Sequence, residues 1–425
     1  MPSLIVYGAV FGIAFCLSYA RWHSVLAPAS LWNGAWMILF LAAALLGSDY
    51  AYPSWDTFLL FLLALSFNIP PFLSSRDDKP IQLNLPLLKA LATPNWVLGA
   101  TAVAGFAGAV HLSMSLGNSL LSLGSLSTIL DAGKTNAASI YRDDLGRSPL
   151  DTVSYALMQY GFAALGTRLR VLPNKSSWFL LLANVAAATT WTLVTTQRSY
   201  FLVAVVWLCG GYIAAAVASR NEKISRGTLR GMILAVASLL IFVVGARAIR
   251  IGGSSAQLGA DSFAGAKLWI AGYIPTFAQW HASRDLGEIY PFRLISGVIG
   301  LLGLPLNDGT SADGEVFTYI GAGQTSNAST MMRAVVLVSG DLGAFLIVIA
   351  LSAICTWLYT RARQGRPQAV AAYVGAVTVI LWSVNAWQFS NGNRVLAQIV
   401  VSCGLGLATL LAHSKAKKES ARVGQ

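Results

Sequence analysis

Residues 334–358 read AVVLVSGDLGAFLIVIALSAICTWL, and this stretch decides the class of fold. It carries one charged side chain, Asp341, and is longer than the roughly 20 apolar residues that a helix needs to cross a ~30 Å hydrocarbon layer. Hydrophobic residues make up 56% of the chain and charged residues 11%, whereas about a quarter of a soluble domain is charged. Similar blocks recur at 4–20, 28–46, 57–74, 96–116, 151–167, 177–196, 199–219, 231–246, 369–387 and 395–412. The sequence predicts an all-α polytopic membrane protein, a single integral membrane domain with about eleven transmembrane helices and up to about thirteen.

The net charge of +12 follows the positive-inside rule and does not indicate a nucleic-acid partner. Basic connections such as RLRVLPNKSS at 168–177 and SRNEKISRGTLR at 219–230 alternate with connections that lack basic residues, such as SDYAYPSWD at 48–56. If the basic connections face the cytoplasm, the N-terminus lies outside and the C-terminus inside. This topology places residues 247–333 on the outer face.

Two long polar connections interrupt the apolar blocks on the predicted outer side. Residues 247–333 form the large outer loop, and residues 117–150 form a second loop that is either a lid over a site or a solvated connection. Within the large loop, 262–281 and 291–306 are long enough to enter the membrane. Charged residues and a proline make full spans costly, so we expect interfacial or re-entrant helices there.

Arginines gather at the predicted outer ends of the helices, where an unpaired charge is costly. Arg198 separates two apolar runs, Arg247 and Arg250 follow the eighth block, and Arg333 begins the ninth. A guanidinium presents a planar fork of donors that suits phosphate oxygens, and a helix beginning near Thr330 would add backbone donors. The alternative is that each arginine anchors separately at lipid headgroups.

His281 lies in the large loop and is a candidate proton acceptor. A lone histidine is also often a surface or packing residue, and Glu315 and Asp341 are competing acids or bases. Because Asp341 lies inside an apolar run, we expect it to have a cationic or hydrogen-bonding partner. Tyr273 belongs to a group of aromatic residues that either form an interfacial belt or stack on sugars. Arg284 and Asn327 complete the candidate substrate-binding residues.

The chain shows no pattern for a metal or another cofactor. No Walker, dinucleotide, HExxH or DxD motif occurs, and none of the four cysteines has metal-binding spacing. The sequence therefore predicts chemistry without a cofactor.

Four segments together resemble the O-antigen polymerases (Wzy-type), the oligosaccharide repeat unit polymerases. They are TTQRSYFL at 195–202, GARAIRIGG at 245–253, WIAGYIPTFAQW at 269–280 and TSNASTMMRAVVLVSGDLGAF at 325–345. The resemblance covers roughly residues 185–360. It implies a GT-C-like, inverting, metal-independent glycosyltransferase of the bacterial inner membrane that works at the periplasmic face.

The resemblance also implies substrates and roles. The donor would be a growing glycan on undecaprenyl pyrophosphate, the acceptor a lipid-linked repeat unit, and a further partner a chain-length regulator. Arginines at positions 198, 247 or 250, and 333 would hold the pyrophosphate, and His281 would be the candidate for the histidine that related ligases use. Two other functions stay open: an O-antigen ligase that transfers glycan to lipid A core, and a flippase or transporter of lipid-linked oligosaccharides.

Overall fold

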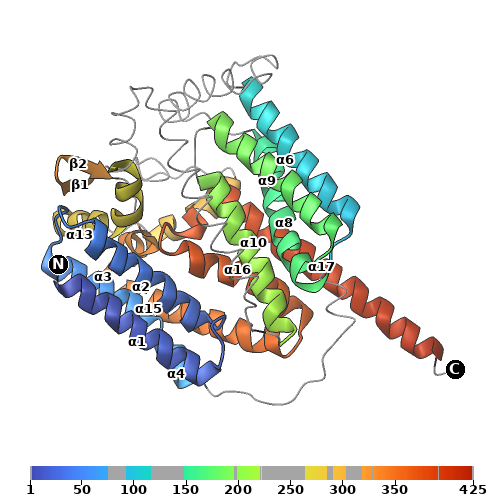
Figure 1. The fold of residues 1–425 in the computed structure, drawn as a ribbon, viewed down its shortest axis with the longest axis horizontal. Helices are drawn as coiled ribbons and strands as arrows, with labels where there is room; N and C mark the ends of the chain where they lie inside the picture. Colours follow the sequence, from blue (N-terminus) through green and yellow to red (C-terminus); the bar gives the residue numbers. More distant parts are fainter. Residues whose placement is uncertain are drawn as a thin grey trace. The chain divides into compact units, whose positions relative to one another are not determined.

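The computed structural model describes residues 2–74, 92–115, 148–195, 199–220, 222, 264–284, 291–302, 318–326, 330–390 and 392–423. Helices account for most of this part of the chain (Figure 1). Seven helical segments are long and apolar enough to cross a membrane, judged by length and composition. They are α1 (Pro2–Trp22), α2 (Pro28–Leu46), α3 with α4 (Ser54–Leu73), α6 (Asn95–Ser115), α9 (Lys175–Thr195), α10 (Ser199–Ala218) and α15 (Met331–Arg363). The chain is a helical, multi-pass membrane protein, as the sequence predicts.

Three further helices occupy predicted apolar blocks: α8 (Pro149–Val171), α16 (Pro367–Trp382) and α17 (Gly392–Val423). The predicted eighth block, 231–246, lies outside the described residues, as does nearly all of the second outer loop, 117–150, whether it is a lid or a solvated connection. The total of about eleven spans stays a prediction.

The chain forms two compact units. The first unit comprises Met1–Ile81, Ala266–Gln364 and Ala376–Val395, and the second comprises Gln82–Gly265, Gly365–Gly375 and Leu396–Gln425. The candidate site described below belongs entirely to the first unit.

Helices α6, α8, α9 and α10 pack together in the second unit. The closest approach is between α8 and α10, where a Cβ atom on Gly211 would lie 1.9 Å from the carbonyl oxygen of Ala163. Such contact between helix backbones requires a residue without a side chain, as is common where membrane helices pack. In the same unit, Trp191 is buried and its indole N–H donates to the Gly105 carbonyl oxygen at 2.7 Å.

The first unit has a core of α1, α2, α3 and α15 that includes one buried amide pair. The block predicted at 57–74 is interrupted, because α3 (Ser54–Ser66) ends before α4 (Ile69–Leu73), and Pro70 and Pro71 follow the break. At the break, the Asn68 and Asn33 side chains exchange hydrogen bonds of 2.7 and 3.0 Å. Stacked rings of Trp32 and Phe67, 4.1 Å apart, pack beside this pair.

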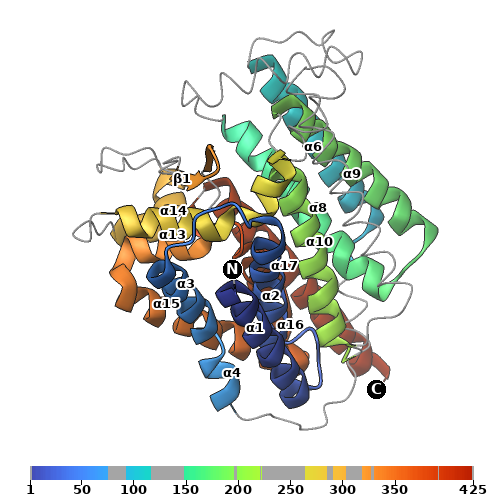
Figure 2. The same cartoon turned by 60° about the vertical axis from the view of Figure 1, so that its left-hand side comes forward.

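The described parts of the predicted outer loop form short elements at one end of this core (Figure 2). Residues 264–271 are helical and are followed, after a break at Gly272, by α13 (Tyr273–Ser283); η2 (Pro291–Ile295) and α14 (Ser296–Leu301) come next. Neither 262–281 nor 291–306 is a continuous helix of spanning length within the described residues. Their predicted interfacial or re-entrant placement stays a prediction.

A small hairpin at the same end was not predicted by the sequence. Strands β1 (Thr318–Gly321) and β2 (Gln324–Ser326) pair antiparallel around a turn with positive φ at Gly321, Ala322 and Gly323. The Ala51 N–H donates to the Ile320 carbonyl oxygen at 2.8 Å, which joins the α2–α3 connection to the hairpin. The ammonium of Lys267 contacts Asp49 of that connection at 2.5 Å. These contacts tie three distant segments of sequence together next to α13.

Candidate functional site

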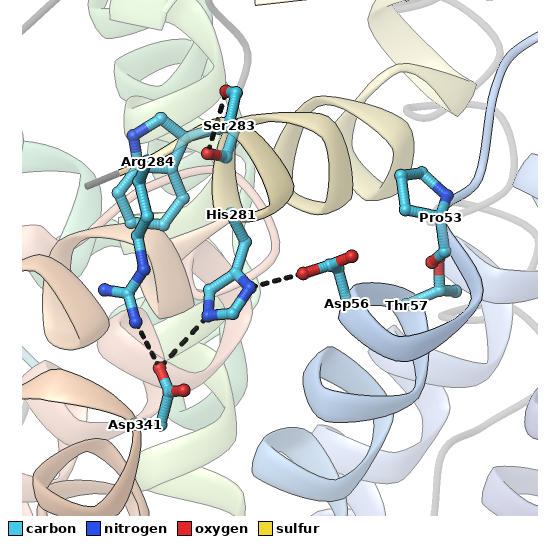
Figure 3. A network of polar contacts seen from close by, with 8 residues as sticks. Pro53, Asp56, Thr57, His281, Ser283, Arg284 and Asp341 are labelled. Carbon is cyan, nitrogen blue, oxygen red and sulfur yellow. Dashed lines mark hydrogen bonds and ion pairs between the residues drawn. The ribbon is translucent and has the colours of Figure 1, made fainter. Parts of the chain in front are cut away.

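His281 is the centre of a charged cluster that brings together three helical segments (Figure 3). Its Nδ1 lies 2.5 Å from Asp56 Oδ1, and its Nε2 lies 3.1 Å from Asp341 Oδ1. The same Asp341 oxygen accepts a hydrogen bond from Arg284 Nη2 at 2.6 Å. The predicted residues His281, Arg284 and Asp341 therefore form one network, and Asp341 has the partners that its apolar setting requires.

Local sequence explains how α3 supplies Asp56. Pro53 precedes the helix, and the Thr57 hydroxyl donates to the Pro53 carbonyl oxygen at 2.7 Å. Asp56 lies in the first turn, where a carboxylate interacts favourably with the positive end of the helix dipole. Its side chain is 12% exposed and points toward the histidine ring (Figure 3).

A break in α15 places Asp341. Gly340 has φ 66° and ψ −179° inside an otherwise helical segment. This backbone conformation is essentially restricted to glycine. The second half of α15 begins next to this break, so its first residue, Asp341, is held beside His281.

The histidine ring faces a carboxylate oxygen with each of its nitrogens. A neutral imidazole has one N–H and can donate one hydrogen bond, so donation to Asp56 and Asp341 at the same time requires an imidazolium. The carboxylates of Asp56 and Asp341 thus face the two nitrogens of the ring, and the Arg284 guanidinium pairs with Asp341. A buried group of charges is tolerated when it is paired in this way.

Aromatic side chains enclose the cluster. The Phe277 ring stacks on the His281 ring at 5.7 Å and 16°, one turn earlier on α13. Trp280 lies beside two guanidinium groups, with Arg284 Cζ 5.6 Å and Arg333 Cζ 5.2 Å from the ring centroid. Trp280 and Arg333 are buried. The structure thus brings the predicted residues Arg333 and Arg284 to the same tryptophan.

Two polar groups near these arginines have no hydrogen-bond partner among the described residues. They are the Arg284 Nε–H and the Thr330 hydroxyl, both buried. Thr330 is the N-cap residue of α15, and its side chain makes no capping bond. Buried polar groups in proteins nearly always have partners, so these donors are suited to a ligand with acceptor oxygens.

The other predicted site residues are only partly accounted for. The Tyr273 hydroxyl donates to Asn385 Oδ1 at 2.5 Å, which joins α13 to the segment after α16. This contact does not test the prediction that Tyr273 stacks on a sugar. Five predicted residues lie outside the described part of the chain: Arg198, Arg247, Arg250, Glu315 and Asn327.

Two residues of the site were missed by sequence reasoning, Asp56 and Trp280. Asp56 lies at the end of SDYAYPSWD, which reads as an ordinary polar connection. Its signal was a carboxylate directly before an apolar block, where a membrane boundary makes an unpaired charge costly. Trp280 reads as part of an interfacial aromatic belt until its arginine neighbours are known.

Within the described ranges, no three His, Cys, Asp or Glu side chains are arranged to hold a metal ion. The charged side chains of the cluster are instead paired with one another: His281 contacts Asp56 and Asp341, and Arg284 contacts Asp341. Such an arrangement can bind an anion through the arginines and accept a proton through the histidine or a carboxylate.

Comparison with known proteins returned no matching family model, no matching curated protein and no matching solved structure.

Proposed function

We propose that this protein is a membrane glycosyltransferase that lengthens a glycan carried on a lipid diphosphate, by inverting transfer at the outer face of the bacterial inner membrane. The donor is a glycan on undecaprenyl pyrophosphate and the acceptor is one lipid-linked repeat unit. The observation that carries the proposal is the network of His281, Asp56, Asp341 and Arg284, with Arg333 beside it.

The arginines support a diphosphate as leaving group. When the bond between the sugar C1 and the phosphate oxygen breaks, negative charge grows on the diphosphate, and preorganised guanidinium groups stabilise that charge. Arg333 and the Thr330 hydroxyl, which has no hydrogen-bond partner among the described residues, lie at the start of α15, and the start of a helix favours an anion. Arg284 shares the Trp280 ring with Arg333. One well-placed donor contributes about 3 kcal/mol to the transition state, or roughly a hundredfold in rate.

The histidine–carboxylate network supports removal of the acceptor proton. The acceptor hydroxyl loses its proton as its oxygen attacks C1, and a positioned base accelerates this step by about 10²–10⁴-fold. Asp56 lies in the first turn of α3, and Asp341 follows the break at Gly340 inside α15. The predicted topology places the start of both helices on the outer side, where lipid-linked sugars are the activated donors.

Purified protein in liposomes, supplied with lipid-linked repeat units alone, tests the proposal. We expect a ladder of longer lipid-linked products. Arg333→Ala should lower the rate at least about a hundredfold at unchanged protein abundance. Arg361→Ala is a matched control, because Arg361 lies on the same helix and also stacks on a tryptophan, Trp357, with Cζ 5.7 Å from the ring centroid, but at the opposite end. If the wild type lengthens no glycan, the proposal is wrong.

Transport is the second candidate, and the chain of side chains from Asp56 through His281 to Asp341 is the observation that favours it. Chains of aspartate and histidine relay protons in pumps and transporters. The same liposomes separate the two functions: a transporter would move labelled lipid-linked glycan across the bilayer without lengthening it. A ligase would form product only after lipid A core is added.

A further inference from the structure

We infer that the proton acceptor of this site is the carboxylate of Asp341 and that His281 positions it. The inference rests on the proposed glycan transfer and deepens it by assigning the base. It also gives Asp56 a role, as the group that orients the histidine.

Exposure separates the two candidate bases. The His281 side chain is 4% exposed and the Asp341 side chain is 37% exposed. Phe277 covers one face of the imidazole, and both ring nitrogens face carboxylate oxygens. An acceptor hydroxyl must come within about 3 Å of the base, and Asp341 is the group that it can reach.

The two oxygens of Asp341 have different surroundings. Both hydrogen bonds, from His281 Nε2 and from Arg284 Nη2, end on Oδ1. Within the described chain, Oδ2 receives no hydrogen bond, and Figure 3 shows it beside the occupied oxygen with no contact drawn. One oxygen is therefore used for orientation and the other is left for the substrate.

Asp56 and His281 hold the carboxylate in place. Asp56 Oδ1 lies 2.5 Å from Nδ1 and fixes the orientation of the ring, which aims Nε2 at Asp341. Donation to both carboxylates requires an N–H on each ring nitrogen, and a ring in that form has no lone pair left to accept a proton. His281 and Asp56 act through Asp341 as positioning residues.

Binding of the donor would change the partners of Arg284. In the structure this guanidinium contacts Asp341, while its Nε–H is buried without a partner among the described residues. A diphosphate carries more negative charge than a carboxylate and accepts several guanidinium hydrogen bonds at once. When Arg284 turns to the diphosphate, Asp341 keeps His281 as its partner on Oδ1.

The reaction step then balances. The acceptor oxygen forms the new bond to C1 as its proton passes to Asp341 Oδ2, and the old C1–O bond breaks with its electron pair staying on the lipid diphosphate. Arg284 and Arg333 neutralise that charge. The proton then passes from Asp341, whose side chain is 37% exposed, to water.

Rescue by added small bases tests the assignment. We expect Asp341→Ala to lose at least about a hundredfold in transfer rate, and added formate to restore part of it, because formate can take the place of the missing carboxylate. His281→Ala should lose activity without rescue by imidazole. Restored activity of His281→Ala with imidazole, or no response of Asp341→Ala to formate, would overturn the inference.

Binding of undecaprenyl pyrophosphate provides a readout that does not depend on catalysis. Asp341→Asn keeps the shape of the side chain and removes its charge, so Arg284 is freed and the variant should bind this lipid severalfold more tightly. Weaker binding would contradict the exchange of Arg284. Asp49→Asn is the control, because Asp49 is also paired with a cation, Lys267, but is not part of the network. Transfer by the wild type in the liposome assay shows separately that the proposed function itself holds.

Discussion

Replacing Gly340 with alanine tests whether the break in α15 places Asp341. At φ 66° and ψ −179°, an alanine costs about 1–3 kcal/mol if the backbone keeps its conformation. An alanine in a regular helix is more stable than glycine by about 0.5–1 kcal/mol. The substitution therefore favours a regular helix through position 340 by about 1.5–4 kcal/mol, which shifts the equilibrium between broken and regular forms by roughly tenfold to several hundredfold.

A regular helix would move Asp341 away from its partners, because successive residues in an α-helix are rotated by about 100°. We expect Gly340→Ala to lower the melting temperature of the full chain and to remove most glycan transfer. Intrinsic tryptophan fluorescence during heating and the liposome assay measure the two effects. Gly99→Ala on α6 is the control, because a Cβ there meets no atom within 4 Å. If Gly340→Ala has the same melting temperature and the same transfer rate as Gly99→Ala, the break does not place Asp341.

Two further predictions concern packing and pH. Gly211→Ala places a methyl group 1.9 Å from a backbone oxygen of α8, so the two helices must separate. We expect the free energy of unfolding to fall by about 1–3 kcal/mol, which lowers the melting temperature below that of Gly99→Ala. Equal melting temperatures would contradict the packing described. The hydrogen bond from Lys267 lowers the pKa of Asp49 in the folded protein. This contact therefore stabilises the fold at pH values above about 4, the pKa of an aspartate in the unfolded chain. The stabilisation is lost as the pH falls through the lower pKa of the folded state. Because Asp49 is 46% exposed, the effect is at most about 1 kcal/mol. Lys267→Met should melt slightly below wild type at pH 7, and the gap should shrink as the pH falls below the unfolded pKa of about 4. A constant gap would refute the assignment.

The helices could be predicted because their cause is local. Each apolar block must satisfy its backbone groups within the bilayer, and a helix does so without help from distant residues. The break between α3 and α4 was missed, although Pro70 and Pro71 signal it. The hairpin was also missed, since its strands have only four and three residues and depend on a contact with the α2–α3 connection.

The site could be predicted only in part. His281 stood out as the histidine of the large outer loop, and Asp341 stood out because a charged group in an apolar run needs a partner, which the structure supplies. Which partner it is depends on tertiary packing, so the contact of His281 with Asp56, 225 positions away, had no signal in the sequence. Tyr273 illustrates the same limit, because its hydroxyl bonds Asn385 and its ring could equally have been placed at a lipid boundary.

The distances along the chain between the network's members have a consequence for biogenesis. Asp56 precedes His281 by 225 residues, and Asp341 follows after another 60. At roughly 5–20 residues per second, a ribosome needs about a quarter of a minute to a minute to pass from the first to the last. During that interval the nascent protein contains Asp56, and later His281, without the Asp341 carboxylate that completes the network. The network is therefore complete only late in synthesis, once Asp341 has been added to the chain.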